Sequence, residues 1–305
     1  MSSLNLEKYD EWKDDKQFVE DVMRFLDNVM TDFINRAPDS FKHAKYSAIR
    51  ERSVGLGVMG LHSYFQQKSI PFGSVMSKVW NKKIFKDIQE KVDAASILLA
   101  EEKGSCPDAE EYGIKERFSN KTAIAPTASI SIICGGASPG IEPIAANSYT
   151  HKTLSGSYNV RNKYLARLLN KYNKNNDEVW SSITTNQGSV SHLDFLTNEE
   201  REIFKTAFEI DQRWVVELGA DRTPHISQAQ SINVFIPADI HKKELHNIHF
   251  QAWKKGLKSL YYCRSKSIQR AENINSGSST DVTKNVYSKK TEKENDKYEE
   301  CLSCQ

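Results

Sequence analysis

Predicted helices and short apolar strands alternate along the first 269 residues, and this alternation restricts the fold more than any other feature. Residues 18–33 and 79–103 repeat apolar side chains every three or four positions, which indicates amphipathic helices. Gly104 and Pro107 provide a C-terminal cap and a break after the second helix. Further helices are predicted over residues 160–172, 197–208 and 239–256. Extended segments are predicted at residues 121–127, 231–237 and 258–263. Strands that alternate with helices favour parallel pairing, so we predict an α/β architecture with parallel strands.

A change in composition near residue 270 separates a folded part from a tail. Beyond it Ser, Asn, Thr, Lys and Glu dominate, and hydrophobic residues almost vanish. Such a segment cannot bury enough apolar surface to offset the entropy lost on ordering, so residues 270–305 are predicted to be disordered. Residues 1–269 are predicted to form the folded domain. Near its end the tail carries two cysteines, Cys301 and Cys304.

The bulk composition excludes several classes of protein. The 305 residues carry a net charge of +2, far from the basic excess of a dedicated nucleic-acid binder. No apolar run is long enough to span a bilayer, and the acidic, polar N-terminus lacks the features of a signal peptide. The five cysteines are too few and too scattered for a disulfide framework. We therefore predict a cytoplasmic protein without a membrane or nucleic-acid partner.

Residues 55–60 read Gly-Leu-Gly-Val-Met-Gly and match the G-x-G-x-x-G pattern of dinucleotide-binding folds. That function requires a buried strand before the motif and an acidic residue at the end of the next strand. Here residues 50–53 are polar, and the position about twenty residues further on falls inside a predicted helix. Close packing of a strand against a helix explains the glycines better.

A loop of small residues follows the first predicted strand. Its hydroxyl groups come from Thr127, Ser129 and Ser131. Backbone N–H groups that are exposed in such a loop can bind a phosphate. Many loops rich in Ser and Thr bind nothing, so the residues alone leave both interpretations open.

Two further clusters have both a structural and a functional explanation. Tyr261 and Tyr262 are adjacent in a predicted strand, where they would point to opposite faces. Packing in and beside the core explains them, and the functional alternative is a redox-active pair. His241, His246 and His249 lie on one predicted helix, but carboxylate or cysteine partners for a metal site cannot be identified. We expect these histidines on the surface.

The spacing of Cys301 and Cys304 has three interpretations. Half of a four-cysteine zinc site would need a second pair, which the chain lacks. A thioredoxin-like motif would follow a strand and open a helix, which this position does not. Thiol–disulfide exchange on a flexible arm is the favoured hypothesis. An arm of about thirty residues spans roughly 30 Å, enough to move between a buried site and the surface.

Several stretches together resemble the C-terminal part of the large, catalytic subunit of class I ribonucleotide reductase. They are residues 52–61, 125–129, 140–143 and 256–262, and the terminal cysteine pair completes the set. The resemblance extends from about residue 21 to residue 305, and the order and spacing of the motifs are specific. It implies half of a ten-stranded α/β barrel and the reduction of ribonucleoside diphosphates to deoxyribonucleoside diphosphates by radical chemistry.

The resemblance also implies roles for individual residues. The loop that binds the substrate's diphosphate corresponds to Pro126, Thr127, Ala128, Ser129 and Ile130. The pair that relays a radical between the small subunit and the active site corresponds to Tyr261 and Tyr262. The tail dithiol corresponds to Cys301 and Cys304; it reduces the active-site disulfide after each turnover and is regenerated by thioredoxin or glutaredoxin.

The chain departs from the family in what it lacks. In the family, the radical-bearing cysteine and the two cysteines oxidised by substrate lie upstream of the region matched here. Cys106, Cys134 and Cys263 do not correspond to them, and we expect only a packing role for Cys134. The initiating Met1 suggests a naturally split subunit. It would bind no cofactor directly and would need the N-terminal half of the large subunit, together with a small subunit whose metal supplies the radical.

Two other functions are alternatives to this one. The chain could be a non-catalytic interaction protein that binds reductase subunits or completes the barrel. It could also be a stand-alone dithiol oxidoreductase, which would reduce disulfides without other subunits. The expected location is the cytoplasm, or the host cytoplasm if the gene is viral.

Overall fold

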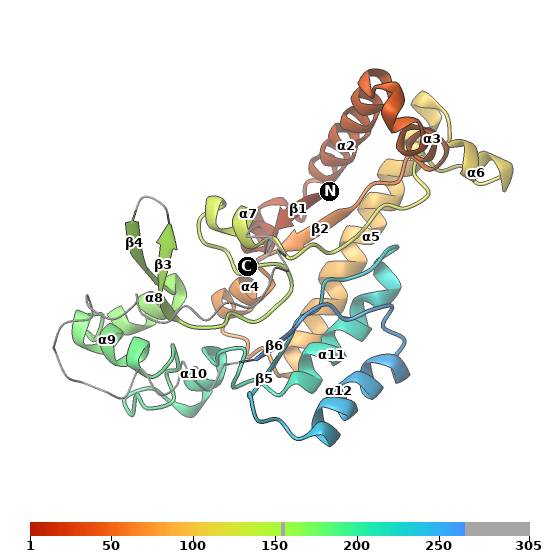
Figure 1. Ribbon diagram of the computed structural model, residues 1–305. Helices are drawn as coiled ribbons and strands as arrows, with labels where there is room; N and C mark the ends of the chain where they lie inside the picture. Colours follow the sequence, from red (N-terminus) through yellow and green to blue (C-terminus); the bar gives the residue numbers. More distant parts are fainter. Residues whose placement is uncertain (154–155, 266–305) are drawn as a thin grey trace, which may run out of the picture.

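The computed structural model of the chain describes residues 1–153 and 156–265 (Figure 1). The predicted boundary at residue 270, the tail, Cys301 and Cys304 lie outside the described residues. Helices and strands are mixed in the described part, as predicted. None of the helices described there has both the length and the apolar composition needed to cross a membrane.

Five segments of the chain run in parallel and form the structural frame. β1 (Ser2–Asn5) pairs in parallel with β2 (Leu56–Met59). Isolated parallel bridges then join Leu56 to Thr122 and Ile124 to Gln230. The chain beyond Gln230 continues into β5 (Val234–Ile236), which pairs in parallel with β6 (Cys263–Ser265). The predicted parallel pairing is confirmed.

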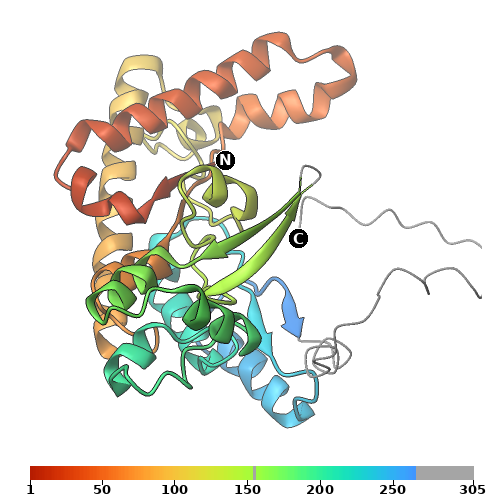
Figure 2. The ribbon, with the colours of Figure 1, turned by 90° about the vertical axis from the view of Figure 1, so that its left-hand side faces the viewer.

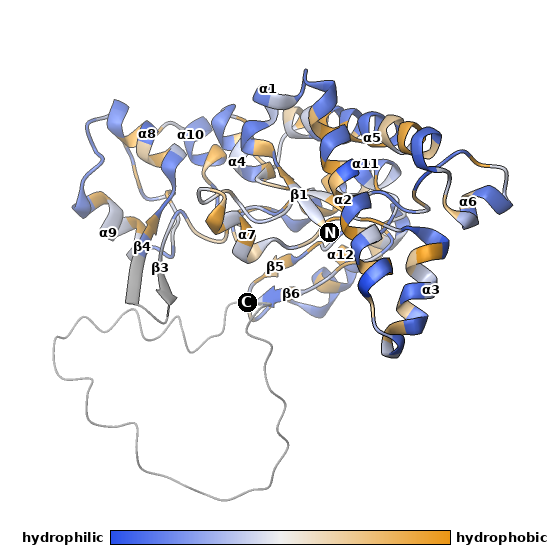
Figure 3. Cartoon of the chain, turned by 90° about the horizontal axis from the view of Figure 1, so that it is seen from above, coloured by the Kyte–Doolittle hydropathy of each residue, from blue (hydrophilic) through white to orange (hydrophobic). Residues whose placement is uncertain are grey.

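Two of the predicted extended segments differ from the structure in detail. The segment expected at residues 121–127 forms only the two isolated bridges. The strand expected at residues 258–263 begins only at Cys263, so Tyr261 and Tyr262 precede β6 instead of lying within it. β5 is hydrophobic along its length and lies beside the more hydrophilic β6 (Figure 3). Such an exposed partner strand lacks the alternating apolar signal on which strand prediction depends.

The glycine motif of residues 55–60 permits close packing of strands. A Cβ atom on Gly57 would lie 2.3 Å from the carbonyl oxygen of Ala123, so only glycine fits there. Gly60 ends β2 with a φ of +82°, which glycine adopts without strain. The segment before the motif is a helix, α3 (Lys42–Glu51), and not the strand that a dinucleotide fold requires. The packing explanation is therefore correct, although Gly57 contacts a neighbouring extended segment and not a helix.

The two long helices that the sequence predicts are both confirmed. In α2 (Lys16–Arg36) the Asp15 carboxylate accepts hydrogen bonds from the first backbone N–H groups. In α5 (Val75–Lys103) Ser74 and Ser77 form a reciprocal capping box, and Gly104 follows with a φ of +85°. Figure 2 shows α2 lying across one end of α5.

The main hydrophobic core lies between the parallel frame and the helices α2, α4 (Leu61–Gln67), α5 and α11 (Gln212–Arg222). Phe65, Phe85 and Leu218 are among its fully buried side chains. Each side chain of this size contributes about 1.5–3 kcal/mol when it leaves water. The shorter elements of this body are η1 (Leu6–Lys8), α1 (Tyr9–Trp12), η2 (Asp39–Phe41), α6 (Pro107–Glu111) and η3 (Thr223–His225).

A buried cluster of charges joins α2 to two loops and to the end of α5. Asp27 is fully buried, and its carboxylate lies 2.6 Å from Arg52 Nη2, 2.9 Å from Arg117 Nε and 3.0 Å from Lys103 Nζ. Burial alone would raise the pKa of Asp27. The hydrogen bonds from Arg117, Lys103 and Arg52 outweigh burial and lower that pKa.

A second, smaller core lies under an excursion of the chain. The hairpin of β3 (Ser148–Thr153) and β4 (Gly156–Arg161) projects from the body and is followed by α8 (Lys163–Lys171), α9 (Asp177–Thr185) and α10 (Asn198–Ile203) (Figure 1). Leu165, Trp180 and Ile183 are fully buried in this cluster. The Asn147 side chain ties it to the body by donating to the carbonyl oxygens of Gly188 and Phe204.

The boundaries of three predicted helices need correction. α8 begins at Lys163, because Val160 and Arg161 belong to β4. The capping box of Thr197 and Glu200 is confirmed, but α10 ends at Ile203, so residues 204–208 continue outside the helix. α12 (Lys242–Lys254) starts later than predicted because His241, and not Asp239, accepts the capping hydrogen bond.

Candidate functional site

The 126–130 loop follows the bridge at Ile124 and leads into α7 (Ala128–Ile133). Thr127 adopts the left-handed conformation, with a φ of +56°. Its side chain does not cap α7; instead, Thr127 Oγ1 accepts a hydrogen bond of 2.7 Å from the backbone N–H of Gly140. A Cβ atom on Gly140 would lie 3.1 Å from the carbonyl oxygen of Ala125. The loop is therefore fixed closely against the segment that contains Gly140.

The outer side of this loop faces solvent. Ser129 and Ile130 are exposed, Pro126 and Ala128 are half-buried, and Thr127 is buried. The first N–H groups of any helix lack partners within the helix, so this turn offers donors to an anion. The three hydroxyl groups predicted to be available are not equivalent, because Thr127 holds Gly140 and Ser131 donates to the carbonyl oxygen of Ala128. Only Ser129 presents an exposed hydroxyl.

Tyr261 and Tyr262 lie just before β6, and each is a little under half exposed. Their ring centroids are 4.1 Å apart with an angle of 53° between the planes. Opposite faces of a strand would separate the rings, so the expectation that they point apart is wrong. The backbone here has not yet entered the regular β6 pairing, which allows both rings to lie on one side. The Arg264 guanidinium lies 5.7 Å from the centroid of the Tyr262 ring.

Hydrogen bonds to the neighbouring chain segment fix the backbone of the tyrosine pair. The Tyr261 N–H donates to the Ile232 carbonyl oxygen over 2.8 Å. The Tyr262 N–H donates to Asn233 Oδ1 over 2.9 Å, and the Tyr262 carbonyl oxygen accepts from Val234 N–H. The pair is therefore positioned by the strand segment that leads into β5.

Glu142 connects this segment to the part of the chain that holds the loop. It follows Gly140 by two residues, and only 7% of its surface is exposed. Its Oε1 accepts a hydrogen bond of 3.3 Å from the Asn233 backbone N–H. Burial raises the pKa of Glu142 to about 7, while hydrogen bonds from Asn233 and the charges of Arg264 and Arg222 oppose the rise. A chain of contacts thus runs from the 126–130 loop through Glu142 and Asn233 to Tyr262.

Glu142 and Asn233 are site residues that the sequence did not reveal. Glu142 lies in a stretch that carries the family resemblance, but its burial follows only from the fold. Asn233 lies 91 residues away in sequence, and nothing in its immediate neighbours marks it. The only local sign is a polar residue inside an apolar extended segment.

The cysteines and histidines take positions that partly differ from expectation. Cys106 is buried, whereas Cys134 is exposed at the C-terminal end of α7, so the packing role expected for Cys134 is wrong. Cys263 is exposed directly after the tyrosine pair, and partial burial raises the pKa of its thiol. The three histidines at and within α12 are exposed, as expected: His241, His246 and His249.

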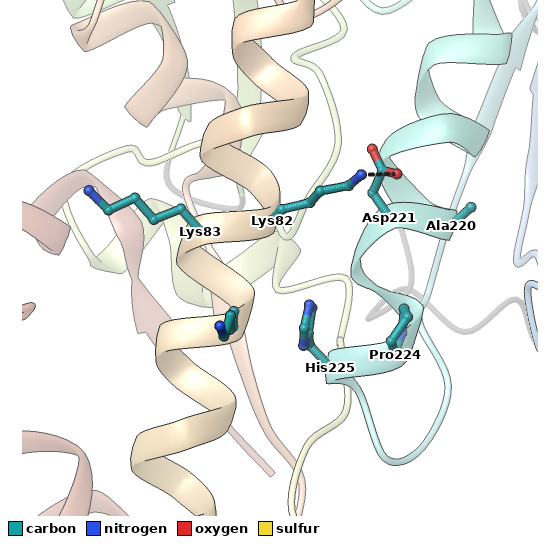
Figure 4. A pocket seen from close by; sticks show the side chains of 7 residues that line it. Lys82, Lys83, Ala220, Asp221, Pro224 and His225 are labelled. Carbon is teal, nitrogen blue, oxygen red and sulfur yellow. Dashed lines mark ion pairs between the residues drawn. The ribbon is translucent and has the colours of Figure 1, made fainter.

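Two surface hollows lie at different places relative to the 126–130 loop and the tyrosine pair. One of about 640 Å³ lies beyond the end of α7, between α4, the base of the β3–β4 hairpin and the start of α8. Another of about 500 Å³ lies between α5 and the end of α11, where Lys82 forms an ion pair with Asp221 over 3.3 Å (Figure 4). Neither Tyr262 nor any residue of the 126–130 loop lines the second hollow, so it lies outside the candidate site.

Comparison with known proteins identifies the class of this fold. Residues 1–116 and 107–263 match the family model described as "Ribonucleotide reductase, barrel domain". The chain therefore belongs to the family of ribonucleotide reductase barrel domains. A solved structure, the Actinobacillus ureae class Id ribonucleotide reductase alpha subunit, superposes with a TM-score of 0.81 at 39% identity, covering 87% of this chain and 49% of that one.

Two curated relatives place the match more closely. The large subunit of ribonucleoside-diphosphate reductase from Invertebrate iridescent virus 6 is 50% identical over 90% of this chain and 29% of its own length. The corresponding subunit from Invertebrate iridescent virus 3 is 43% identical over 92% of this chain and 45% of its own length. The chain spans less than half the length of these two relatives. The predicted membership of the reductase large-subunit family, and the α/β barrel fold, are confirmed.

Proposed function

We propose that this chain supplies the C-terminal part of the catalytic barrel of a ribonucleoside-diphosphate reductase large subunit. It would reduce ribonucleoside diphosphates to deoxyribonucleoside diphosphates once the N-terminal half of the barrel and a radical-generating small subunit are present. The observation that carries this proposal is the family match over both motifs, together with the linkage of the 126–130 loop to the tyrosine pair through Gly140, Glu142 and Asn233.

The 126–130 loop would bind the diphosphate of the substrate. Its exposed turn offers backbone N–H groups and the Ser129 hydroxyl, which suit a phosphate anion. Pro126, Thr127 and Ala128 would hold the shape of the loop, because Thr127 is anchored to Gly140. Ile130 would lie at the outer rim, where it is exposed.

Tyr261 and Tyr262 would relay a radical between the small subunit and the active site. Ring centroids 4.1 Å apart support short transfer steps between adjacent phenols. In each step an electron leaves one phenol as its proton moves to a hydrogen-bonded neighbour. The radical itself would come from a metal-containing small subunit. Among the described residues, no group of three or more His, Cys, Asp or Glu is arranged to hold a metal ion.

Cys301 and Cys304, which lie outside the described residues, would return the active site to its reduced state. Reduction of the ribose takes two electrons from a pair of active-site thiols, which become a disulfide. A thiolate of the tail would attack that disulfide, and the second tail cysteine would complete the exchange and leave an oxidised tail. Thioredoxin or glutaredoxin would then reduce the tail.

The parallel frame would give the N-terminal half of the barrel a place to attach. Among the described strands, β1 and β6 each pair along one side only. Unpaired strand edges bind other strands readily. The N-terminal half, whether joined to this chain or on a separate polypeptide, would complete the barrel along these edges. The assembled enzyme would work in the cytoplasm, where a reducing environment maintains the thiols.

Reconstitution tests the proposal. The chain is combined with the N-terminal part of the large subunit of a relative and with that relative's small subunit, and formation of deoxyribonucleoside diphosphate is followed by chromatography. Product should appear only when all three are present. Robust reduction by this chain alone would contradict the need for assembly. Stable assembly without any turnover would instead favour a non-catalytic, barrel-completing protein.

A further inference from the structure

Glu142 is a buried acid that lacks the partners usually found around a buried charge. Only 7% of the Glu142 surface is exposed. Among the described residues it nevertheless forms no ion pair within 4.0 Å. A carboxylate is costly to bury without a cation close by. Glu142 Oε1 accepts a hydrogen bond of 3.3 Å from the Asn233 backbone N–H, and the Asn233 side chain also lowers the pKa of Glu142. The fold therefore keeps an acid where an apolar residue would be more stable.

Asn233 contacts both Glu142 and Tyr262, so the position of Tyr262 depends on that of Glu142. The Asn233 side chain is 1% exposed, and its Oδ1 accepts the Tyr262 N–H over 2.9 Å. Because its oxygen accepts from Tyr262, the amide nitrogen is the group of this side chain that can donate to Glu142. A carboxylate can only accept hydrogen bonds, which forces the nitrogen toward Glu142 and the oxygen toward Tyr262.

The segment that carries Glu142 is also the one that holds the 126–130 loop. Gly140 donates to Thr127 Oγ1 over 2.7 Å, and its carbonyl oxygen accepts from the Leu61 N–H. Ile141, between Gly140 and Glu142, is 1% exposed in the main core. Three consecutive residues thus have three different contacts. Gly140 contacts the loop, Ile141 the core, and Glu142 contacts Asn233, which binds the Tyr262 backbone.

We propose that Glu142 is a positioning residue for the radical relay, which acts through Asn233 to fix Tyr262 relative to the 126–130 loop. This inference rests on the proposed function of the two motifs. It adds a residue that reaches Tyr262 through Asn233 and that fixes how far apart the two motifs lie. Substrate binding by the loop should be nearly independent of Glu142, whereas radical transfer should depend on it.

The ionised form of Glu142 should support the relay best. A protonated carboxyl can donate to Asn233 Oδ1 and so permits a flipped amide, which would lose the bond to Tyr262. The charges that act on Glu142 are Arg222, which is buried and bonded to Gln230 and Asn81, and Arg264 beside the Tyr262 ring. Burial lowers the pKa of Arg222 only to about 9, so a pH dependence of the relay through about pH 7 that Glu142→Gln removes would report Glu142.

The test uses the reconstituted complex with Glu142→Leu, Glu142→Gln and Glu7→Gln. Glu7 is the matched control because it is also a buried glutamate, 8% exposed, but is held by Lys163 and Tyr164, away from Asn233. Turnover is measured against pH, and the KM for the nucleoside diphosphate is measured alongside. An electron paramagnetic resonance signal is recorded from a 3-aminotyrosine placed at position 262, which traps the radical.

Glu142→Leu should lower kcat on the order of 100-fold, as expected for a misplacement of about 1 Å, with KM within about twofold. The trapped radical should form more slowly by a similar factor. Glu142→Gln should retain more activity and lose the pH dependence near 7, and Glu7→Gln should behave as the parent. Unchanged kcat in Glu142→Leu, or a pH profile that Glu142→Gln leaves unaltered, would overturn the proposal.

A second measurement separates this proposal from the proposed function. Hydrogen exchange of the Tyr262 amide is followed in the chain alone, with circular dichroism to confirm that each variant is folded. Glu142→Leu should accelerate that exchange at least about tenfold, because the acceptor on Asn233 is no longer held in place. If the parent complex reduces no nucleotide, the proposed function fails, and unchanged exchange at Tyr262 would separately overturn the role of Glu142.

Discussion

Two buried carboxylates in this protein, Asp27 and Glu142, have opposite surroundings. Asp27 is enclosed by Arg52, Arg117 and Lys103, and its pKa is lowered. Glu142 has no ion pair within 4.0 Å among the described residues, it accepts a hydrogen bond from the Asn233 backbone, and burial raises its pKa to about 7. The first arrangement joins three parts of the fold and leaves the acid ionised under all ordinary conditions. The second keeps an acid near its titration point beside the proposed relay. The partners thus distinguish the two acids: Asp27, which stabilises the fold, is paired with cations, whereas Glu142, which is proposed to serve the chemistry, is not.

The largest expected effect is on turnover, with little change in stability. Tyr262→Phe should abolish turnover of the assembled enzyme, because a phenyl ring has no O–H to lose. The free energy of unfolding should change by no more than about 1 kcal/mol, since only one hydroxyl of a partly exposed side chain is removed. Activity assays and urea unfolding measure the two quantities. Tyr112→Phe, at an 82% exposed tyrosine, is the control, and turnover that survives Tyr262→Phe would count against the relay.

The next effect concerns stability alone. Asp27→Asn should lower the free energy of unfolding by about 3–5 kcal/mol, because it leaves buried Arg52 and Arg117 without a counter-charge. Urea unfolding at pH 7 measures this loss. The exposed pair of Arg36 and Asp32 offers a control, since Asp32→Asn should change stability by less than about 1 kcal/mol.

The pH dependence of the same site has a definite sign. The pKa of Asp27 is lower in the folded state than in the unfolded chain, so its contribution is present above the unfolded value and is lost as the pH falls through the folded value. The stability difference between the parent and Asp27→Asn should therefore shrink below about pH 4. A constant difference down to pH 2 would contradict the assignment.

Glu142 should show the reverse trend with a somewhat smaller effect. Its folded pKa of about 7 lies above the ordinary value of 4.5, so the folded state binds more protons and stability falls as the pH rises from about 4.5 to about 7. Glu142→Gln removes this loss. At pH 8 the variant should be more stable than the parent by up to about 3 kcal/mol, and the gain should vanish near pH 4. Equal stability at pH 8 would mean that the carboxylate is well solvated.

The smallest expected effect lies on the exposed side of the 126–130 loop. Ser129→Ala removes the one exposed hydroxyl among the three of this segment and should weaken nucleoside diphosphate binding by the complex about two- to tenfold. Calorimetric titration measures the affinity. Ser40→Ala, at another exposed serine, should leave it unchanged. No change in the Ser129 variant would restrict phosphate binding to the backbone.

The sequence predicts those features that depend on neighbours in the chain. The periodicity of residues 18–33 and 79–103 gives α2 and α5, and the polar residues 50–53 argue correctly against a dinucleotide fold at residues 55–60. The 126–130 loop and the tyrosine pair follow from family resemblance. The face on which Tyr261 and Tyr262 lie could not be predicted, because it depends on where pairing with β5 begins. Asn233 and Glu142 could not be paired, because their contact is set by the packing of the frame.

Among the described strands β1 and β6 pair on one side only, so under the proposed assembly the stability of this half-barrel would depend on the concentration of its partner. A partner that binds only the folded chain adds RT ln(1 + [partner]/Kd) to its free energy of unfolding, about 2.7 kcal/mol at a hundredfold excess over Kd. The melting temperature of the chain should therefore rise as the partner is titrated, without any change in the chain itself. In a cell, the abundance of one half would then follow the abundance of the other, because the unassembled chain unfolds and is degraded more often.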